Sequence, residues 1–222
     1  MYIEFLIEDL SGGKLIEKIM DKYKAAYPDL FYRIHSFRGI GYLKKQIKED
    51  DVKTKKLLTD LPIYLKGISR QLVDMGDDTA IVVVLDNDKR DCKEFKKMLV
   101  DIQSHNMIQT RIAFCIAIEE MEAWLLGDKD AVHKTFPKAR ISNLTGYIQD
   151  EIVSTGTWEL LADIVYPGGA KKMKKDCPTF REIGAIKFDW AEKIGSNIDI
   201  HKNTSPSFQY FIKKINSIIN EN

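Results

Sequence analysis

One segment, residues 79–85, constrains the fold more than any other part of the sequence. It reads Thr-Ala-Ile-Val-Val-Val-Leu, so it is rich in β-branched residues and apolar at consecutive positions. β-Branched side chains favour extended backbone, and a strand without polar alternation is typical of a sheet covered on both faces. The segment therefore predicts a central strand of a parallel sheet that lies between two layers of helices.

Three further segments show strand patterns, and helical patterns separate the strands along the chain. The expected strands are Tyr2–Ile7, Phe31–Phe37, Thr79–Leu85 and Thr110–Ile118. After the first strand, Ser11-Gly12-Gly13 favours a turn, and a helix is expected from Lys14 to Ala26. This alternation predicts the α/β class, with a mainly parallel four-stranded sheet flanked by helices.

The strand pattern ends near residue 127. From about residue 128 the chain holds short helical patterns and a final helix from Ser207 to about Ile219. We therefore predict an α/β domain over residues 1–127 and an α-helical C-terminal extension over residues 128–222 that packs on it.

Charge and composition exclude several classes of protein. The chain has 34 Lys and Arg against 33 Asp and Glu, a net charge of +1, and 44% hydrophobic residues. That balance excludes a histone-like polycation and a wholly disordered chain. The longest apolar runs are far shorter than the roughly 20 residues that span a bilayer, so no membrane association is expected. Because the three cysteines form no C-x-x-C pair, we expect a reducing compartment and a cytoplasmic protein.

Acidic residues follow three of the four expected strands. Asp9 is one of them, and the predicted metal ligands among them are Glu8, Asp86, Asp88, Glu119, Glu120 and Glu122. Because the carboxyl ends of parallel strands meet at one edge of a sheet, we expect these carboxylates to converge. Their mutual repulsion favours a hard divalent cation, Mg²⁺ or Mn²⁺, at that edge.

Basic residues form a second set of candidates. Those predicted to bind phosphate or nucleic acid are Arg38, Lys89, Arg90, Lys171, Lys172, Lys174 and Lys175. Arg38 follows the second strand and would add a guanidinium to the same edge. Lys171 begins the densest positive run of the chain, which suits a phosphate backbone.

Each of these residues also has a purely structural interpretation. An aspartate such as Asp88 commonly caps the helix that follows it, and a glutamate such as Glu120 suits the first turn of a helix. A basic run is usually a solvated face. The joint placement of acids at three strand ends favours the metal site over these alternatives.

Three stretches of the sequence resemble a known family. They are Leu85-Asp-Asn-Asp-Lys-Arg-Asp-Cys92, Glu119-Glu-Met-Glu-Ala-Trp-Leu-Leu-Gly-Asp128 and Ser205-Pro-Ser-Phe-Gln-Tyr-Phe211. Together with Glu8 after the first strand, they resemble the Toprim domain of topoisomerases, primases and overcoming-lysogenization-defect type nucleases. Within that group the resemblance is to a Toprim-like family of microbial proteins.

The resemblance implies a Toprim/Rossmann-like fold and a role for each of three acids. Glu8 would serve as general acid/base or metal ligand, and Asp86 and Asp88 would hold Mg²⁺. The implied activity is Mg²⁺-dependent phosphodiester hydrolysis by a nuclease, with DNA favoured over RNA as substrate. Family members lie beside ATPases in defence-type gene neighbourhoods, which implies an ATPase partner and a role against foreign DNA. A homodimer is compatible with this role.

Two other functions stay open. A carboxylate pair after an apolar strand is also typical of aspartate-nucleophile phosphatases, with Asp86 as nucleophile and Asp88 as acid. Arg90 stands where those enzymes have Thr or Val. The second alternative is a non-catalytic metal-binding subunit, whose acidic edge holds a structural ion while the helical extension docks a partner.

Overall fold

The fold is given by a computed structural model that describes residues 1–41, 56–76, 78–151 and 156–220. The strands are β1 (Tyr2–Ile7), β2 (Phe31–Ser36), β3 (Thr79–Asp86) and β4 (Ile112–Ala117). The helices up to β4 and just after it are α1 (Leu10–Ala26), α2 (Leu57–Val73), α3 (Cys92–His105) and α4 (Glu122–Leu126). The later helices are α5 (Lys129–Thr135), the 3₁₀ helix η1 (Ile141–Leu144), α6 (Thr157–Val165), α7 (Gly169–Asp176), α8 (Phe180–Asn197) and α9 (Pro206–Asn220). Within the described ranges, none of the helices has the length and apolarity needed to cross a bilayer.

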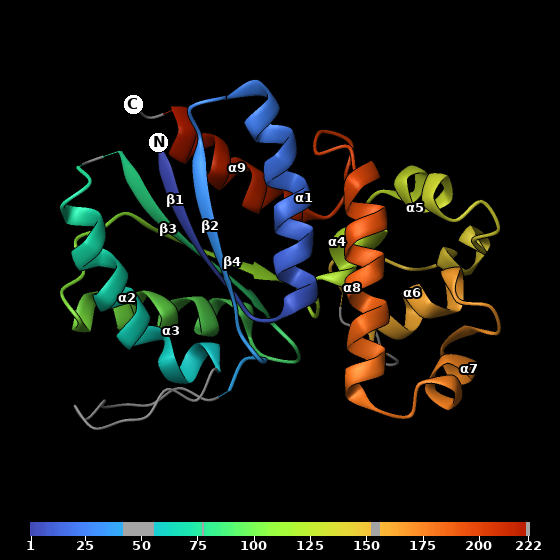
Figure 1. Ribbon diagram of the computed structural model, residues 1–222. Helices are drawn as coiled ribbons and strands as arrows, with labels where there is room; N and C mark the ends of the chain where they lie inside the picture. The colour runs from blue at the N-terminus through green and yellow to red at the C-terminus, as the bar shows by residue number, and fades with distance from the viewer. Residues whose placement is uncertain (42–55, 77, 152–155, 221–222) are drawn as a thin grey trace.

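The strands form one parallel sheet in the order β2-β1-β3-β4 (Figure 1). Strand β3 lies between β1 and β4, and its side chains from Thr79 to Leu85 are buried. The predicted α/β class and the central position of this strand are therefore confirmed. Because β2 and β3 pair with opposite edges of β1, the direction of the chain across the sheet reverses between β1 and β3. Ligands of open parallel sheets gather at such a switch point, beyond the carboxyl ends of the strands.

Helices cover both faces of the sheet. Helices α1 and α9 lie on one face, and α2 and α3 lie on the other (Figure 1). Val82 and Val84 of β3 pack in the core that includes α1, whereas Val83 and Leu85 pack in the core with α2 and α3. Successive side chains of a strand point to opposite faces, which is why β3 is apolar at consecutive positions.

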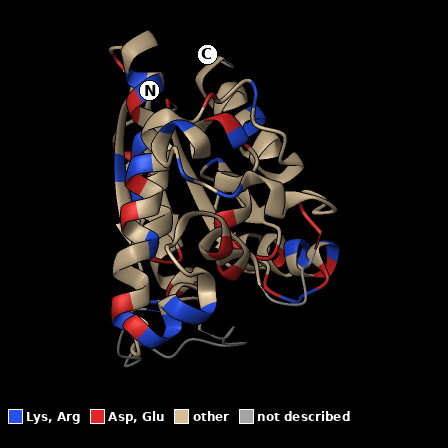
Figure 2. Ribbon diagram, turned by 90° about the vertical axis from the view of Figure 1, so that its right-hand side faces the viewer, with Lys and Arg blue, Asp and Glu red and all other residues tan. Residues whose placement is uncertain are grey.

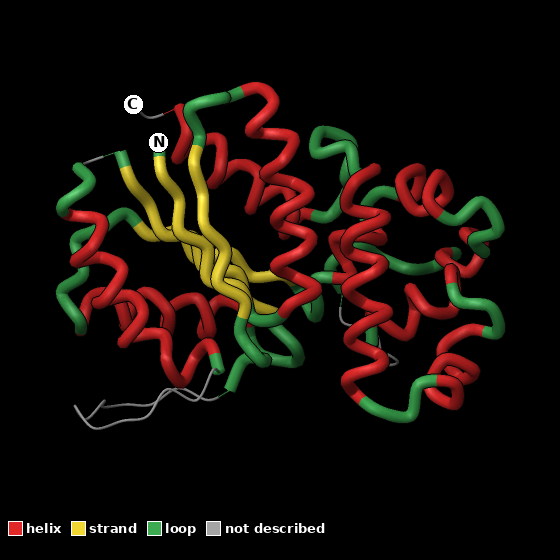
Figure 3. Tube along the Cα trace, in the orientation of Figure 1, coloured by secondary structure: helices red, strands yellow, loops and turns green. Residues whose placement is uncertain are grey.

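After β4 the chain forms a helical lobe beside the sheet and then returns to it. Helices α4 to α8 make up the lobe, and α8 packs along α1 (Figure 3). Helix α9 packs on β4. The fully buried ring of Trp124 in α4 lies 5.5 Å from Phe208 and 5.2 Å from Phe211. Trp124 Nε1 also donates to Ser207 Oγ over 2.8 Å. Two sequence stretches far apart along the chain, around Trp124 and around Phe208, therefore pack on each other.

Helix α1 begins earlier than its glycine pair indicates. The sequence pattern predicts a start at Lys14, but the helix begins directly after Asp9, which is its N-cap. Gly12 and Gly13 are buried inside the first turn of the helix. A Cβ on Gly12 would lie only 2.5 Å from Met121 Sδ. The expected turn is therefore wrong, because these glycines serve the close packing of α1 on the ends of the strands.

Candidate metal site at the carboxyl edge of the sheet

Glu8 and Asp86 lie side by side at the switch point of the sheet. Glu8 is the first residue after β1, and its backbone amide donates to Val84 O over 3.2 Å. Asp86 is the last residue of β3, and its backbone amide donates to Glu8 Oε2 over 3.0 Å. The pairing of the two central strands thus brings together two of the carboxylates predicted to converge at this edge.

The Asp86 side chain has an unsatisfied acceptor. Its Oδ1 is shielded from solvent and has no hydrogen-bond partner among the described residues. Burial raises the pKa of Asp86 well above its ordinary value, and the charges of Glu8 and Asp9 raise it further. The charge of Lys187 opposes this rise without cancelling it. A buried carboxylate oxygen without a donor is unfavourable, so this group favours a proton or a further cation.

Glu8 titrates close to neutral pH. Burial raises its pKa to about 7, the hydrogen bond from the Asp86 amide opposes that rise, and the charge of Asp88 adds to it. The neighbouring Asp9 has a different role, because its Oδ1 accepts a hydrogen bond from the Gly12 amide over 2.7 Å at the start of α1. A carboxyl group with a pKa near 7 can take up or release a proton under physiological conditions.

A lysine from the helical lobe reaches the same edge. Lys187 of α8 lies 3.2 Å from Glu122 Oε2, and their side chains are 16% and 4% exposed. Burial raises the pKa of Glu122, and the charge of Lys187 opposes that rise. Burial alone would lower the pKa of Lys187, but the charges of Glu122 and Glu120 raise it above its ordinary value. The lobe therefore supplies a buried positive charge where the acids converge.

Glu119 and Glu120 form hydrogen bonds with the start of α6. The Thr157 hydroxyl donates to Glu119 Oε2, and the Trp158 amide donates to Glu120 Oε2 over 2.9 Å. Negative charge is stabilising at a helix N-terminus, where backbone donors lack intrahelical partners. Burial raises the pKa of Glu120 to about 7, and the charge of Glu122 contributes to the rise. Both glutamates therefore help to dock the lobe on the sheet.

Two strained residues lie in the loops at this edge. Asp88 has a φ of 50° and Glu119 a φ of 64°, in the left-handed region that residues other than glycine rarely adopt. The Asp88 amide donates to Glu119 O over 2.9 Å, so the two loops hold each other in place. The Asp88 carboxylate is 49% exposed and pairs with Arg90 at 2.6 Å. Strain of this kind clusters at functional sites.

The predicted phosphate-binding residues fall in two places. At the carboxyl edge, the Gly39 amide donates to Glu8 O over 2.9 Å, which puts the exposed Arg38 beside the end of β1. Lys89 is exposed in the loop after β3, next to Arg90. The other candidates, all exposed on α7 in the lobe, are Lys171, Lys172, Lys174 and Lys175.

Two of the lysines on α7 are paired with acids. Lys172 lies 2.5 Å from Asp176, and Lys174 lies 3.0 Å from Glu159. In Figure 2, basic and acidic segments are interspersed over the helices, as the net charge of +1 indicates. The positive charge of α7 is therefore partly neutralised within the lobe.

The carboxylates at this edge fit a hard divalent cation. Asp86 Oδ1 lacks a donor among the described residues, and the charge of Glu8 raises the pKa of Asp86. The described part of the chain contains no preformed group of three His, Cys, Asp or Glu side chains that could hold a metal. Mg²⁺ usually keeps several waters and binds one or two carboxylates together with a substrate phosphate. Glu8 and Asp86, with Asp88 on the exposed side, are therefore the residues that would hold it.

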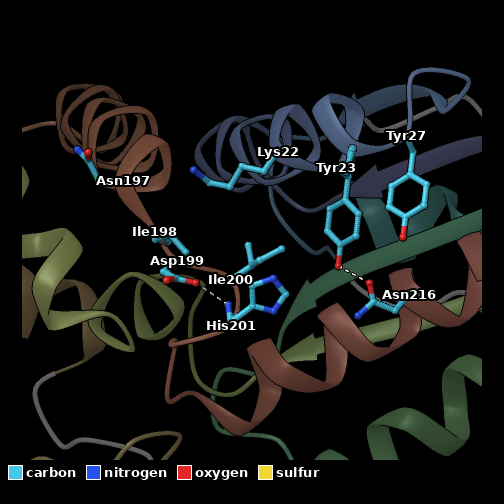
Figure 4. Close-up of a pocket in the computed structure, with 10 residues that line it drawn as sticks. Lys22, Tyr23, Tyr27, Asn197, Ile198, Asp199, Ile200, His201 and Asn216 are labelled. Carbon is cyan, nitrogen blue, oxygen red and sulfur yellow. Dashed lines mark hydrogen bonds between the residues drawn. The ribbon is translucent and has the colours of Figure 1, made fainter.

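A separate cavity of about 560 Å³ lies at the opposite end of α1, against α9 and the loop after α8 (Figure 4). In this cavity the Tyr23 hydroxyl donates to Asn216 Oδ1 over 2.7 Å, and Lys22 Nζ donates to Ser196 O over 2.8 Å. The lining residues come from the far ends of these helices, not from the loops that carry Glu8 and Asp86. The cavity and the acidic edge are thus two different places on the molecule.

Lys187 is the residue at this edge that the sequence-based prediction missed. It lies on the same stripe of α8 as Ile183, Trp190 and Ile194, with the three- and four-residue spacing of one helix face. Lysine is rarely buried unless an opposite charge accompanies it. A lysine on the apolar face of a predicted helix therefore indicates a buried ion pair, and this pattern could have identified Lys187.

Comparison with known proteins assigns the chain to a family. A family model described as a domain of unknown function (DUF4276) matches residues 14–216. Neither the curated proteins nor the solved structures gave a match. The matched range includes Asp86, Asp88 and Lys187. Because the family model covers most of the sequence, the chain belongs to the DUF4276 family.

Proposed function

We propose that this protein is a Mg²⁺- or Mn²⁺-dependent phosphodiester hydrolase, and more narrowly a nuclease. The observation that carries the proposal is the pairing of Glu8 with Asp86, in which one hydrogen bond joins the two residues and Asp86 Oδ1 stays buried without a donor among the described residues. The charges of the two carboxylates repel each other, since the charge of Glu8 raises the pKa of Asp86, and a divalent cation would remove that repulsion. Their position at the switch point of a parallel sheet is where ligands of such sheets bind.

The residues of the edge have separate roles in this proposal. Glu8, Asp86 and Asp88 would hold the cation, which supplies charge neutralisation at the phosphoryl oxygens and an activated water. Glu8, with a pKa of about 7, can accept or donate a proton near neutral pH. Lys187 fixes Glu122 and adds a positive charge that favours an anionic substrate.

Cations near the edge and on the lobe suit a nucleic-acid substrate. Arg38 and Lys89 are exposed next to the strand ends, and the lysines of α7 are exposed on the lobe. Guanidinium and ammonium groups supply most of the affinity of proteins for a phosphate backbone. The preference for DNA, the ATPase partner, the Toprim relationship and the role in defence stay predictions that rest on the sequence resemblance.

The test of this proposal is cleavage of labelled single-stranded and duplex DNA and RNA with Mg²⁺ or Mn²⁺. We expect cleavage by the natural protein and loss of at least about 100-fold in rate for Glu8→Gln and Asp86→Asn, because each removes a negative oxygen that would contact the cation. Asp101→Asn, at an exposed position of α3, is the matched control and should keep full activity. Cleavage that persists in both Glu8→Gln and Asp86→Asn would contradict the proposal.

Two assays separate the nuclease from the alternatives. An aspartate-nucleophile phosphatase would form a phosphoryl-aspartate at Asp86, which a nuclease that uses Asp86 as a metal ligand does not form. Trapping of that intermediate at Asp86 would favour the phosphatase. A non-catalytic metal-binding subunit would bind Mn²⁺ through Glu8 and Asp86 and yet cleave none of the four nucleic acids, so the cleavage assay separates it from the nuclease.

A further inference from the structure

Phe180, the first residue of α8, is 96% exposed. A single exposed apolar residue needs no explanation by itself. Phe180 differs from an ordinary exposed residue because hydrogen bonds fix the backbone on both sides of it. Thr179 and Glu182 form a capping box around it: the Glu182 amide donates to Thr179 Oγ1, and the Thr179 amide donates to Glu182 Oε2 over 3.0 Å. The aromatic ring is thus presented to solvent from a fixed helix start.

Phe180 lies on the same face of α8 as Lys187, the residue that contacts the carboxyl edge of the sheet. Lys187 lies seven residues later, which is almost two full turns, so the two residues share one face of the helix about 10 Å apart along its axis. Lys187 on this face pairs with Glu122 at the carboxyl edge. The first two turns of α8, which begin at Phe180, therefore precede the residue that contacts this edge.

Basic residues surround Phe180 in the sequence. Between residues 169 and 183 the chain has five Lys and Arg against two Asp and Glu. Arg181 is exposed directly after Phe180, and Lys171 and Lys175 are exposed on the preceding helix. Lys174 Nζ lies 5.0 Å from the centre of the Trp158 ring. The end of the lobe thus combines positive charge with an exposed aromatic ring.

We propose that Phe180 is a stacking platform for a base of single-stranded nucleic acid, with the phosphates held by Lys171, Lys175 and Arg181. Aromatic side chains bind single strands by stacking on base faces, and positive charge follows the backbone. Bases inside a duplex are already stacked on each other, so the platform selects single strands. That single strands are the substrate rests on the proposed nuclease function. That Phe180 binds single strands does not depend on it.

The test is fluorescence anisotropy with a labelled 20-nucleotide single-stranded DNA, its duplex and the matching RNA, in EDTA so that no cleavage occurs. We expect Phe180→Ala to weaken single-strand binding about five-fold or more, and Phe180→Tyr to keep the affinity of the natural protein. Lys171→Ala and Lys175→Ala should each reduce the slope of log affinity against log salt by about 0.7, a change that Phe180→Ala should not cause. The DNA and RNA arms show which sugar backbone is bound.

The control is Val73→Ala, which removes another strongly exposed apolar side chain (70%) at the far end of α2. It should leave binding unchanged. Equal binding by Phe180→Ala and the natural protein, or tighter binding of the duplex, would overturn the inference. So would a change in molar mass by light scattering for Phe180→Ala, because it would make Phe180 a contact between copies of the chain. Binding that depends on Phe180 in a protein that cleaves nothing with Mg²⁺ would refute the nuclease alone.

Discussion

The Asp86 backbone amide donates a hydrogen bond to Glu8 Oε2 over 3.0 Å, which joins the ends of the two central strands. The pairing of β1 with β3, with Ile7 opposite Val84, sets this relationship. The register of the two strands therefore places Glu8 and Asp86 at the same point of the carboxyl edge. Functional sites often keep pairs of like charges at the expense of stability. The effect of each carboxylate on the stability of the protein can therefore be measured.

Removing one of the two charges should stabilise the metal-free protein. Asp86→Asn keeps the shape of the side chain and removes the negative charge that Glu8 repels, so we expect the free energy of unfolding at pH 8 to rise by about 1–2 kcal/mol. Urea unfolding in EDTA measures it. Asp101→Asn, at an exposed site of α3, should change stability by less than about 0.5 kcal/mol. A clear loss of stability in Asp86→Asn would mean that its charge has a structural partner.

The metal-free protein should become less stable as the pH rises from about 4.5 to above 7. The pKa values of Glu8 and Glu120 are both raised to about 7 in the folded protein, so the folded state binds more protons than the unfolded state in this window. The stability contributed by their protonated forms is fully present below pH 4.5 and is lost as the pH passes 7.

Each of these two groups should contribute on the order of 1–2 kcal/mol between pH 5.5 and pH 8. Unfolding curves at the two pH values, in EDTA, give the difference. The variant Glu8→Gln should have a flatter profile than the natural protein, and Mg²⁺ at pH 8 should restore part of the lost stability because it binds the deprotonated carboxylates. An identical pH profile for Glu8→Gln would contradict the shift at this residue.

Removal of the lysine charge at the edge should destabilise the fold. Lys187→Gln leaves the buried Glu122 without its partner at 3.2 Å, and we expect a loss of about 2–3 kcal/mol by chemical unfolding. The double variant with Glu122→Gln should recover most of that loss, because it removes the unpaired charge. Lys193→Gln, which breaks an exposed pair with Asp189 in the same helix, should lose less than about 1 kcal/mol. Equal losses at the two lysines would mean that Lys187 is not effectively buried.

The two helical glycines Gly12 and Gly67 should respond in opposite directions to alanine. A Cβ at Gly12 would lie 2.5 Å from Met121 Sδ, so Gly12→Ala should destabilise the protein by about 1–3 kcal/mol. A Cβ at Gly67 in α2 has no atom within 4 Å among the described residues, so Gly67→Ala should stabilise it by about 0.5–1 kcal/mol. The melting temperatures of the two variants measure these changes. A higher melting temperature for Gly12→Ala as well as for Gly67→Ala would contradict the close packing of α1.

Much of the fold could be predicted because the strands β1, β3 and β4 are buried on both faces. The apolar run at Thr79–Leu85 corresponds to β3 almost residue for residue, since helices on both faces leave no position for a polar side chain. The start of α1 could not be predicted in the same way. Gly12 favours a turn in the sequence, and only the approach of Met121 from another element explains why it lies inside a helix.

The candidate site was predictable in part, for a similar reason. Acids at strand ends indicate the edge where Glu8 and Asp86 meet, because parallel strands fix that edge. The partners of Glu120 and Glu122 come from α6 and α8, beyond the sheet. The contact between Lys187 and Glu122 could not be predicted, because the two residues are far apart in the sequence and meet only through the packing of the helical lobe on the sheet.

Calorimetric titration of the metal-free protein with Mn²⁺ at pH 8 tests directly whether Glu8 and Asp86 share a cation. We expect saturable binding by the natural protein, and affinity at least about ten-fold weaker for both Glu8→Gln and Asp86→Asn. Asp101→Asn should bind as the natural protein does. Absence of Mn²⁺ binding by the natural protein, or unchanged binding by both Glu8→Gln and Asp86→Asn, would contradict the claim that these two carboxylates share a cation.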